Sequence, residues 1–429
     1  MKVCVFGLWH LGCVTAACLA DLGFQVNGLD FDEKTILNLK AGVPPLYEPE
    51  LEELIKKNIL TQRLSFYTNP EEALRDINVL WVTFDTPVDD HDVADIPFLE
   101  HSFTQILPFI PPNTRIIISS QAPVGFTRKL ESVCRESFPE KLLIFACSPE
   151  NLRLGNAIKI FREPSRIIVG IRKPEHMSLF SPIFTKITDK IEWMKTESAE
   201  MTKHAINSFL ATSIVFANEL AIICESEGAN AKEVERGLKT EDRIGPKAYL
   251  NPGLSFAGGT LARDINFLID KSKEHKKPLH LLTSVKESNE FHKGWIQRKC
   301  IECFQDVKGI RFGILGLAYK PNTDTLRRSS AVELCNWLHK HSAIVTAYDP
   351  NIKSLPEELS NHITLKTTST DVLTCSDCII IATEHPLFKQ IYNGEKTLFS
   401  GKILIDPGAF IEKNLPAEKD FRYICVGRA

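Results

Sequence analysis

Short, continuously apolar runs recur along the chain and constrain its fold more than any other feature. The first is Val3–Phe6, and the runs Val79–Val82 and Arg115–Ile118 repeat its pattern. A run without polar alternation is typical of a strand buried on both faces of a parallel sheet. Helical patterns lie between the runs, the first from about Gly12 to Leu22. The alternation predicts a doubly wound α/β domain over residues 1–195.

Two further regions follow this domain. From Thr196 to about Glu227 the chain has no glycine or proline, and its apolar residues recur at helical spacing, which predicts one long helix. From residue 301 onward the pattern of strand and glycine turn returns, beginning with Phe312–Leu315. We therefore expect two Rossmann-like doubly wound domains, 1–195 and 301–429, joined by a central helical region, 196–300.

The overall composition argues against several classes of function. With 51 basic and 54 acidic side chains and a net charge of -3, no strong field attracts nucleic acid or an anionic membrane. We find no signal peptide and expect no later stretch to span a bilayer. Twelve scattered cysteines without a disulfide pattern suit a cytoplasmic protein. The pairs Cys300/Cys303 and Cys375/Cys378 are interpreted as packing residues, and no metal is expected.

The turn after the first strand has most features of a dinucleotide site. Gly7 and Gly12 allow backbone to approach a diphosphate at the start of a helix, and Asp30 ends the second strand, where an acid accepts ribose hydroxyls. No basic residue follows Asp30 directly, which favours NAD over NADP. The second glycine of the fingerprint, however, is replaced by Trp9. The alternative is a structural turn with a solvated Asp30.

Two segments carry a resemblance to a known family. Residues 252–264 read Pro-Gly-Leu-Ser-Phe-Ala-Gly-Gly-Thr-Leu-Ala-Arg-Asp, and Lys203 precedes Asn207 by one helical turn. Both segments resemble the nucleotide-sugar (UDP-glucose/GDP-mannose) dehydrogenases. Where the family has the cysteine that holds the substrate as a thiohemiacetal and then a thioester, this chain has Thr260. An alcohol needs an adjacent base to act as a nucleophile, whereas a thiol is partly ionised near neutral pH.

The resemblance implies roles for the remaining catalytic positions. Lys203, Asn207 and Asp264 would surround the sugar C6 oxygen. Lys203 would stabilise the developing oxyanion, and Asp264 would act through a water on the proton. Glu150 matches a family glutamate, and it completes the candidate catalytic set with Thr260. The departures concern the thioester and its hydrolysis. They are Thr260, Leu154 in place of a second glutamate, and Gln121 in place of a threonine that helps hold water.

The resemblance also implies binding residues. For the cofactor, NAD, these are Gly7, Trp9, Leu11, Gly12, Asp30, Thr86 and Arg327. For the nucleotide sugar they are Arg243, Tyr249, Gly253, Phe256, Gly258, Gly259 and Lys320. In the family, the arginine that matches Arg243 reaches the sugar nucleotide of the partner subunit, so a homodimer is expected.

The sequence thus predicts an NAD-dependent oxidoreductase that acts on a nucleotide sugar, most simply a UDP-hexose. We expect a two-electron oxidation without thioester hydrolysis, giving an aldehyde or ketone, or a redox-neutral epimerisation. Two alternatives stay open. One is a full UDP-glucose 6-dehydrogenase with a substitute nucleophile, for which Cys147 is the nearest candidate in sequence. The other is a non-catalytic homologue that binds nucleotide sugars, for which Trp9 is the best argument.

Overall fold

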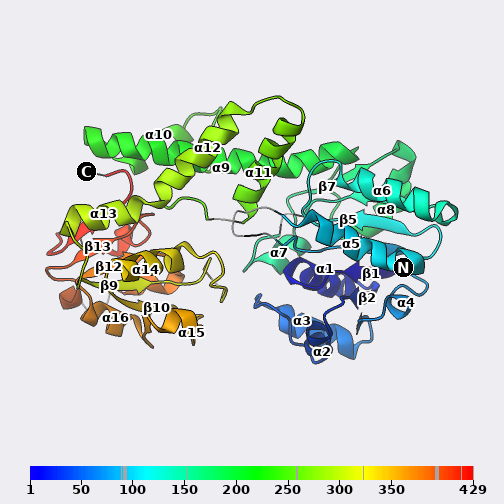
Figure 1. The fold of residues 1–429 in the computed structure, drawn as a ribbon, viewed down its shortest axis with the longest axis horizontal. Coiled ribbons are helices and arrows are strands. Elements are labelled where there is room, and N and C mark those ends of the chain that lie inside the picture. Colours follow the sequence, from blue (N-terminus) through cyan, green and yellow to red (C-terminus); the bar gives the residue numbers. More distant parts are fainter. Residues whose placement is uncertain are drawn as a thin grey trace. The chain divides into compact units, whose positions relative to one another are not determined.

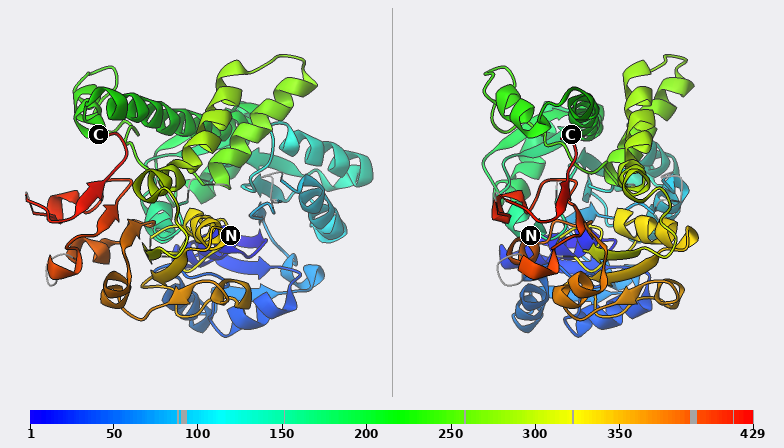
Figure 2. Two further views of the ribbon diagram at one scale, coloured as in Figure 1. Left: turned by 60° about the vertical axis from the view of Figure 1, so that its left-hand side comes forward. Right: turned by 90° about the vertical axis from the view of Figure 1, so that its left-hand side faces the viewer.

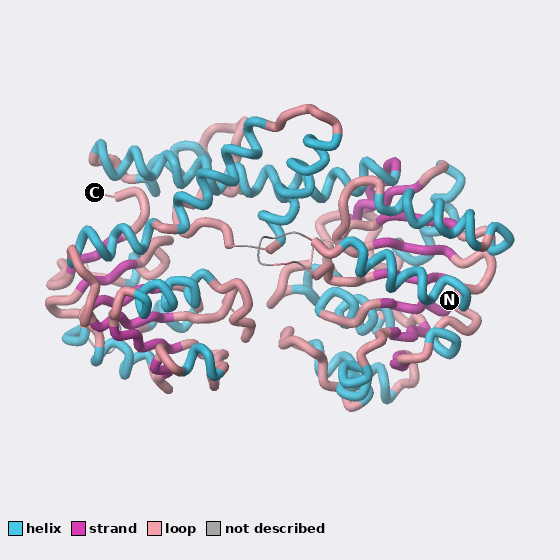
Figure 3. Tube along the Cα trace, in the orientation of Figure 1, coloured by secondary structure: helices cyan, strands magenta, loops and turns pink. Residues whose placement is uncertain are grey.

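The computed structural model describes residues 1–87, 89, 94–150, 152–257, 259–321, 323–391, 396–416 and 418–428. The chain divides into two compact units, Met1–Ile206 and Asn207–Ala429. In the first unit strands alternate with helices, whereas the second unit begins with a run of helices and has its strands from Arg311 onward, as the colours of Figure 3 show. The boundary between these two units falls inside a helix and does not coincide with a predicted domain boundary. The predicted division into the domains 1–195, 196–300 and 301–429 therefore stays a prediction.

The first unit is built on a mainly parallel sheet. In the part of the chain that the structure describes, this sheet has eight strands in the order β3-β2-β1-β4-β5-β6-β7-β8, and only the pair β6 and β7 is antiparallel. The strands are β1 (Lys2–Phe6), β2 (Gln25–Leu29), β3 (Leu64–Tyr67), β4 (Val79–Val82), β5 (Arg115–Ile118), β6 (Ile144–Cys147), β7 (Ile167–Ile171) and β8 (Ile191–Lys195). The helices are α1 (His10–Asp21), α2 (Glu33–Lys40), α3 (Leu51–Leu60), α4 (Pro70–Ala73), α5 (Ile96–Ile106), α6 (Phe126–Ser137), α7 (Ala157–Arg162) and α8 (Met177–Phe184).

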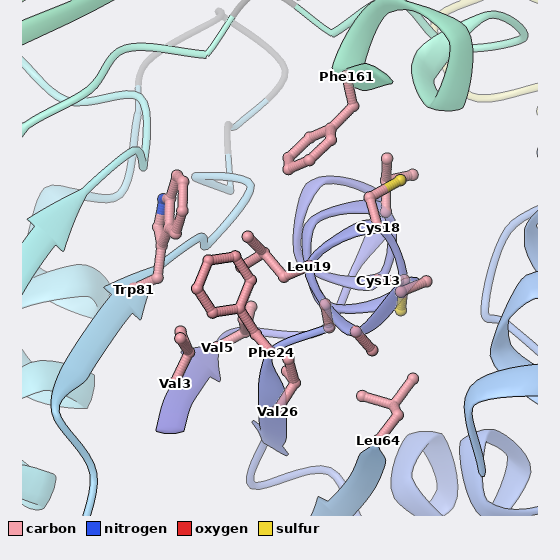
Figure 4. Close-up of a cluster of buried hydrophobic side chains, with 14 of the residues drawn as sticks. Val3, Val5, Cys13, Cys18, Leu19, Phe24, Val26, Leu64, Trp81 and Phe161 are labelled. Atoms are coloured by element: carbon pink, nitrogen blue, oxygen red, sulfur yellow. The ribbon is translucent and has the colours of Figure 1, made fainter. Parts of the chain in front are cut away.

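Strand β1 explains why the apolar runs have no polar alternation. Val3 and Val5 belong to the core cluster that contains α1, whereas Cys4 and Phe6 belong to a second cluster on the opposite face. Figure 4 shows the first of these clusters, in which side chains from β1, β2 and β4 surround Leu19 of α1. Both faces of the sheet are therefore covered by helices, as the sequence predicted.

Helix α9 (Thr196–Glu227) begins in the first unit and ends in the second, and it is the long rod in Figures 1 and 2. Its bounds match the prediction. The expectation that no stretch could span a bilayer was wrong, because α9 is long and apolar enough by length and composition, with 44% of the tested window buried. Ala211 and Val215 of α9 pack in one core cluster, and Ala221 and Cys224 pack in another, as in a core helix.

The second unit combines helices with a second parallel sheet. Its helices are α10 (Ala231–Lys239), α11 (Thr260–Glu274), α12 (His280–Lys293), α13 (Trp295–Phe304), α14 (Ser330–Lys340), α15 (Glu357–Ser360) and α16 (Ser369–Cys375). Its strands are β9 (Arg311–Leu315), β10 (Ile344–Tyr348), β11 (Thr364–Leu365), β12 (Cys378–Ile381), β13 (Ile403–Ile405) and β14 (Arg422–Ile424). Among the described residues the order is β11-β10-β9-β12-β13-β14, which is the dinucleotide-fold order. The predicted fold class is confirmed.

Candidate functional site

The turn between β1 and α1 requires its two glycines. Gly7 has a φ of +95°, and a Cβ there would lie 2.8 Å from the ring of Phe84. A Cβ on Gly12 would lie 1.8 Å from the carbonyl oxygen of Gly7. The turn can therefore close tightly against the first turn of α1, as binding of a diphosphate requires.

Asp30 contacts this turn, and Trp9 forms part of it. The Asp30 carboxylate accepts hydrogen bonds from the backbone N–H groups of Leu8, at 2.7 Å, and of Asp32, at 3.1 Å. Its position at the end of β2 fits the predicted ribose contact. Trp9 precedes α1 with a φ of -89°, and it is 48% exposed. Because this φ is negative, a side chain is tolerated there without backbone strain.

Helix α9 reaches two loops of the first unit through its early turns. The Lys203 ammonium donates to the backbone carbonyl of Glu150 at 2.7 Å. The buried Glu200 carboxylate accepts from the N–H groups of Gly125, at 2.6 Å, and Thr127, at 2.9 Å, and so caps α6. Lys203 therefore lies against the segment that carries Glu150, and Glu200 fixes the loop that follows Gln121.

A small cavity lies beside Lys203. Its lining combines polar and apolar side chains: Ile118, Ser119, Ser120, Gln121, Ala122, Phe126, Cys147, Pro149, Glu150, Glu200, Lys203 and His204. The Thr86 hydroxyl donates to the backbone carbonyl of Gln121, which joins a predicted cofactor residue to this wall. The cavity therefore brings together Lys203, Glu150 and Gln121.

Cys147 lines the same cavity but is a poor nucleophile. It is 5% exposed, and burial raises the pKa of its thiol well above the ordinary value. All twelve cysteines are free, and most are buried. Among the described residues, no group of three or more His, Cys, Asp or Glu side chains is arranged to hold a metal ion.

The other catalytic candidates belong to the second unit. The Asn207 amide donates to the carboxylate of Asp264, which is fully buried. Thr260 is the first residue of α11, one turn before Asp264, and it is exposed. The predicted Asn207–Asp264 pair is therefore formed, and Thr260 stands one helical turn before it, where the family has its cysteine.

Three buried polar side chains hold the loop before α11, which we call the glycine loop (residues 252–257). Asn218 accepts from the N–H of Gly253 at 3.0 Å, and His292 donates to its carbonyl at 2.8 Å. Asn289 accepts from the N–H of Phe256 at 3.0 Å and donates to its carbonyl at 2.9 Å. The two predicted substrate residues of this loop are therefore fixed through their backbones.

The other predicted substrate residues are distributed around the second unit. A Cβ on Gly259 would lie 3.6 Å from the Tyr319 hydroxyl, and the Lys320 ammonium lies 5.3 Å from the Tyr319 ring centroid. Lys320 and Gly259 are thus brought to the same region. Arg243 and Tyr249 are exposed, and the Arg243 guanidinium pairs with Glu241 at 2.6 Å.

The two remaining binding candidates are Arg327 and Gly258. Arg327 lies in the second unit and is exposed. Its role in binding the cofactor stays a prediction. Gly258 lies outside the described residues.

Sequence reasoning missed Asn289, His292 and Glu200. Asn289 and His292 follow Val285 at spacings of four and seven, on the buried face of α12. A polar side chain on a buried helix face needs a hydrogen-bond partner, and this signal could have marked both residues. Glu200 carried no such signal, because its partners lie about 75 residues away in sequence.

Comparisons with known proteins agree with this arrangement. Residues 1–188 match the NAD binding domain of the UDP-glucose/GDP-mannose dehydrogenase family, residues 197–291 its central domain, and residues 313–413 its UDP binding domain. A UDP-glucose 6-dehydrogenase of Rhizobium meliloti is 30% identical over 439 residues, and the alignment covers 100% of this chain and 100% of the relative. The UDP-glucose 6-dehydrogenase TuaD of Bacillus subtilis is 32% identical over 432 residues, which cover 100% of this chain and 93% of the relative.

A solved structure extends the similarity to the fold. The UDP-glucose dehydrogenase of Pyrobaculum islandicum has a TM-score of 0.88 at 27% identity, with 100% of this chain and 98% of that chain covered. The predicted cofactor, NAD, is confirmed by the family's NAD binding domain, and a nucleotide sugar is the small-molecule ligand of its UDP binding domain. The chain therefore belongs to the UDP-glucose/GDP-mannose dehydrogenase family of NAD-dependent enzymes.

Proposed function

We propose that the protein oxidises a UDP-hexose by two electrons and does not carry the product through a thioester to the acid. The observation that carries this proposal is the contrast between two parts of the site. The Asn207–Asp264 pair is formed and Lys203 is held against Glu150, whereas position 260 carries an exposed threonine in place of a cysteine. The groups for alcohol oxidation are retained, and the group for covalent catalysis is lost.

The chain's own residues support the first half-reaction. The sugar hydroxyl loses its proton through a water held by Asp264, while the Lys203 ammonium stabilises the resulting alkoxide. Asn207 fixes the orientation of the Asp264 carboxylate through its hydrogen bond. Bound NAD would supply the hydride acceptor for this oxidation, and Gly7, Gly12 and Asp30 would hold it. With oxidation at C6, the product is the 6-aldehyde.

The residues that would form and hydrolyse a thioester, the second half-reaction of the family, are replaced in this chain. A threonine hydroxyl is not ionised near neutral pH, so it attacks an aldehyde far less readily than a cysteine thiolate does. Gln121 and Leu154 stand where the family has a threonine and a glutamate for the hydrolytic water. Cys147 is a poor substitute, because burial raises the pKa of its thiol. These three features support release or retention of the two-electron product.

We propose that the protein acts as a homodimer that pairs through α9. Four large apolar side chains of α9 are exposed, and their spacing places them on one face of the helix. They are Met201 (42% exposed), Phe209 (72%), Phe216 (46%) and Ile223 (60%). The exposed Arg243 suits the role predicted for it, contact with the nucleotide sugar of the partner. Pairing would cover the apolar face that also makes α9 resemble a membrane span.

The product stoichiometry with UDP-glucose and excess NAD tests the proposed function. We expect at most one NADH per sugar, with an aldehyde trapped as its hydrazone and identified by mass spectrometry. Thr260→Cys alone should not restore acid formation, since Gln121 and Leu154 are unchanged. Efficient formation of UDP-glucuronate by the wild type, at two NADH per sugar, would overturn the proposal.

Substrates deuterated at C4, C5 or C6 identify the carbon that is oxidised. We expect the label of the C6 substrate to appear in NADH. Migration of label within the sugar, without net NADH, would instead indicate a redox-neutral epimerisation.

A further inference from the structure

One carboxylate at the dinucleotide turn comes from a distant part of the sequence. Asp85 follows β4, and its Oδ2 accepts a hydrogen bond at 3.3 Å from the backbone N–H of Leu11, in the first turn of α1. The burial of Cys13 raises the pKa of its thiol, and the charges of Asp30 and Asp85 raise it further. Both carboxylates therefore act on the same end of α1.

This end of α1 is where the diphosphate of a dinucleotide is expected. Free N–H groups and the helix dipole make a helix N-terminus favourable for an anion, and in dinucleotide folds the diphosphate takes this place. Helix α1 has twelve residues, no acidic residue in its first turn and no side-chain cap from Trp9. Asp85 thus supplies to Leu11 the negative partner that the helix does not supply for itself.

We propose that Asp85 is an internal anion that competes with the diphosphate of NAD for the first turn of α1, and so lowers the affinity for the cofactor. The proposal rests on the use of NAD by this protein. A bound diphosphate must displace the carboxylate from Leu11 or lie close to its charge. Either event reduces the net gain from binding, because like charges a few ångströms apart repel. Asp85 is exposed, so its charge lies at the solvent-facing side of this turn.

Calorimetric titration of three ligands into two variants tests this role. Asp85→Asn removes the charge but keeps an oxygen that can accept from Leu11, so the turn is preserved. The matched control is Asp76→Asn, at the other end of β4. Asp76 has a φ of +59°, which asparagine tolerates well. The ligands are NAD, ADP-ribose, which keeps the diphosphate, and adenosine, which lacks it.

We expect Asp85→Asn to bind NAD and ADP-ribose about tenfold more tightly than the wild type, and adenosine unchanged. The gain should shrink at high salt, because screening weakens the repulsion between Asp85 and the diphosphate. Asp76→Asn should bind all three ligands like the wild type. NAD binding by Asp85→Asn but not by the wild type would support the proposal in its strongest form.

Three results would overturn the inference. The first is unchanged or weaker NAD binding by Asp85→Asn while the wild type binds NAD, which would leave the proposed oxidoreductase function intact. The second is an equal gain for adenosine, since the effect would then not concern the diphosphate. The third is absence of NAD binding in the wild type and both variants, which would remove the proposed function as well.

Discussion

The contact of the Lys203 ammonium with the Glu150 carbonyl orients a single charge towards the cavity wall. If this charge stabilises the sugar alkoxide, Lys203→Ala should lower kcat about a hundredfold, the usual loss when one oxyanion-stabilising group is removed. The affinity for the nucleotide sugar should stay within about tenfold, because the contact strengthens mainly in the transition state. Steady-state kinetics on the responsive UDP-hexose measures both quantities.

Lys195→Ala is the matched control for this measurement, since Lys195 is exposed at the end of β8. It should leave kcat unchanged. A wild-type kcat for Lys203→Ala would show that the lysine is only part of a solvated helix face and that the inherited mechanism is wrong.

Residues related by local spacing could be predicted, whereas residues related by long-range contact could not. Lys203 and Asn207 are four positions apart, so a helix brings them to one face whatever else the chain does. The contact between Leu11 and Asp85 spans 74 positions, and nothing near either residue indicates it. Thr260 could be identified as a departure from the family pattern, but its exposure and the burial of Cys147 required the structure.

At the scale of elements, α12 holds the glycine loop through Asn289, which is 1% exposed. Asn289→Ala would leave the N–H and carbonyl of Phe256 without partners, at about 1–3 kcal/mol of unfolding free energy for each group. We expect a lower melting temperature and weaker binding of UDP-glucose, because the loop carries predicted substrate contacts. Thermal unfolding and calorimetry measure the two effects.

Asn289→Asp is the informative comparison for this loop. It keeps an acceptor for the Phe256 N–H but places a buried negative charge against the Phe256 carbonyl, so its loss of stability at neutral pH should be at least that of alanine. A stable Asn289→Ala with unchanged UDP-glucose affinity would contradict the role of α12 as a support for the loop.

His292, on the same helix, predicts a pH dependence of stability. Burial lowers its pKa below the ordinary 6.5. The unfolded chain therefore takes up a proton at a higher pH than the folded chain. The contribution of His292 to stability is present above about pH 6.5 and is lost as the pH falls below that value. In denaturant titrations, the difference in unfolding free energy between wild type and His292→Gln should change in this window. A constant difference from pH 8 to pH 5 would refute the prediction.

The elements themselves could largely be predicted from the sequence, because their signals are periodic. Helix α9 has the predicted bounds, since no glycine or proline interrupts it. Helix α1 begins at His10, two residues before the expected Gly12, because the turn at Gly7 is tight enough to let the helix start at once. The contacts of Asn218, Asn289 and His292 with the glycine loop could not be predicted. An isolated asparagine or histidine in a helical segment does not indicate which distant backbone group it will bond.

At the scale of the whole molecule, the exposed face of α9 predicts the oligomeric state. Phe209→Asp and Phe216→Asp together place two charges in the proposed interface, and we expect a monomer in analytical ultracentrifugation at micromolar concentration. Leu60→Asp, at an 83% exposed position outside α9, is the matched control and should leave the dimer intact. A dimer that survives both α9 substitutions would show that subunits pair elsewhere.

Helix α9 also fixes the rotation about its axis that separates two candidate catalytic residues, Lys203 and Asn207. The boundary between the two units falls after Ile206, so Lys203 belongs to the first unit and Asn207 to the second. Both residues nevertheless lie on the same continuous helix, α9. Their axial offset is about 6 Å, and each added residue would turn one group by about 100° relative to the other. Insertions or deletions within this single turn should therefore be excluded among active relatives, whereas substitutions on its solvent side should be tolerated.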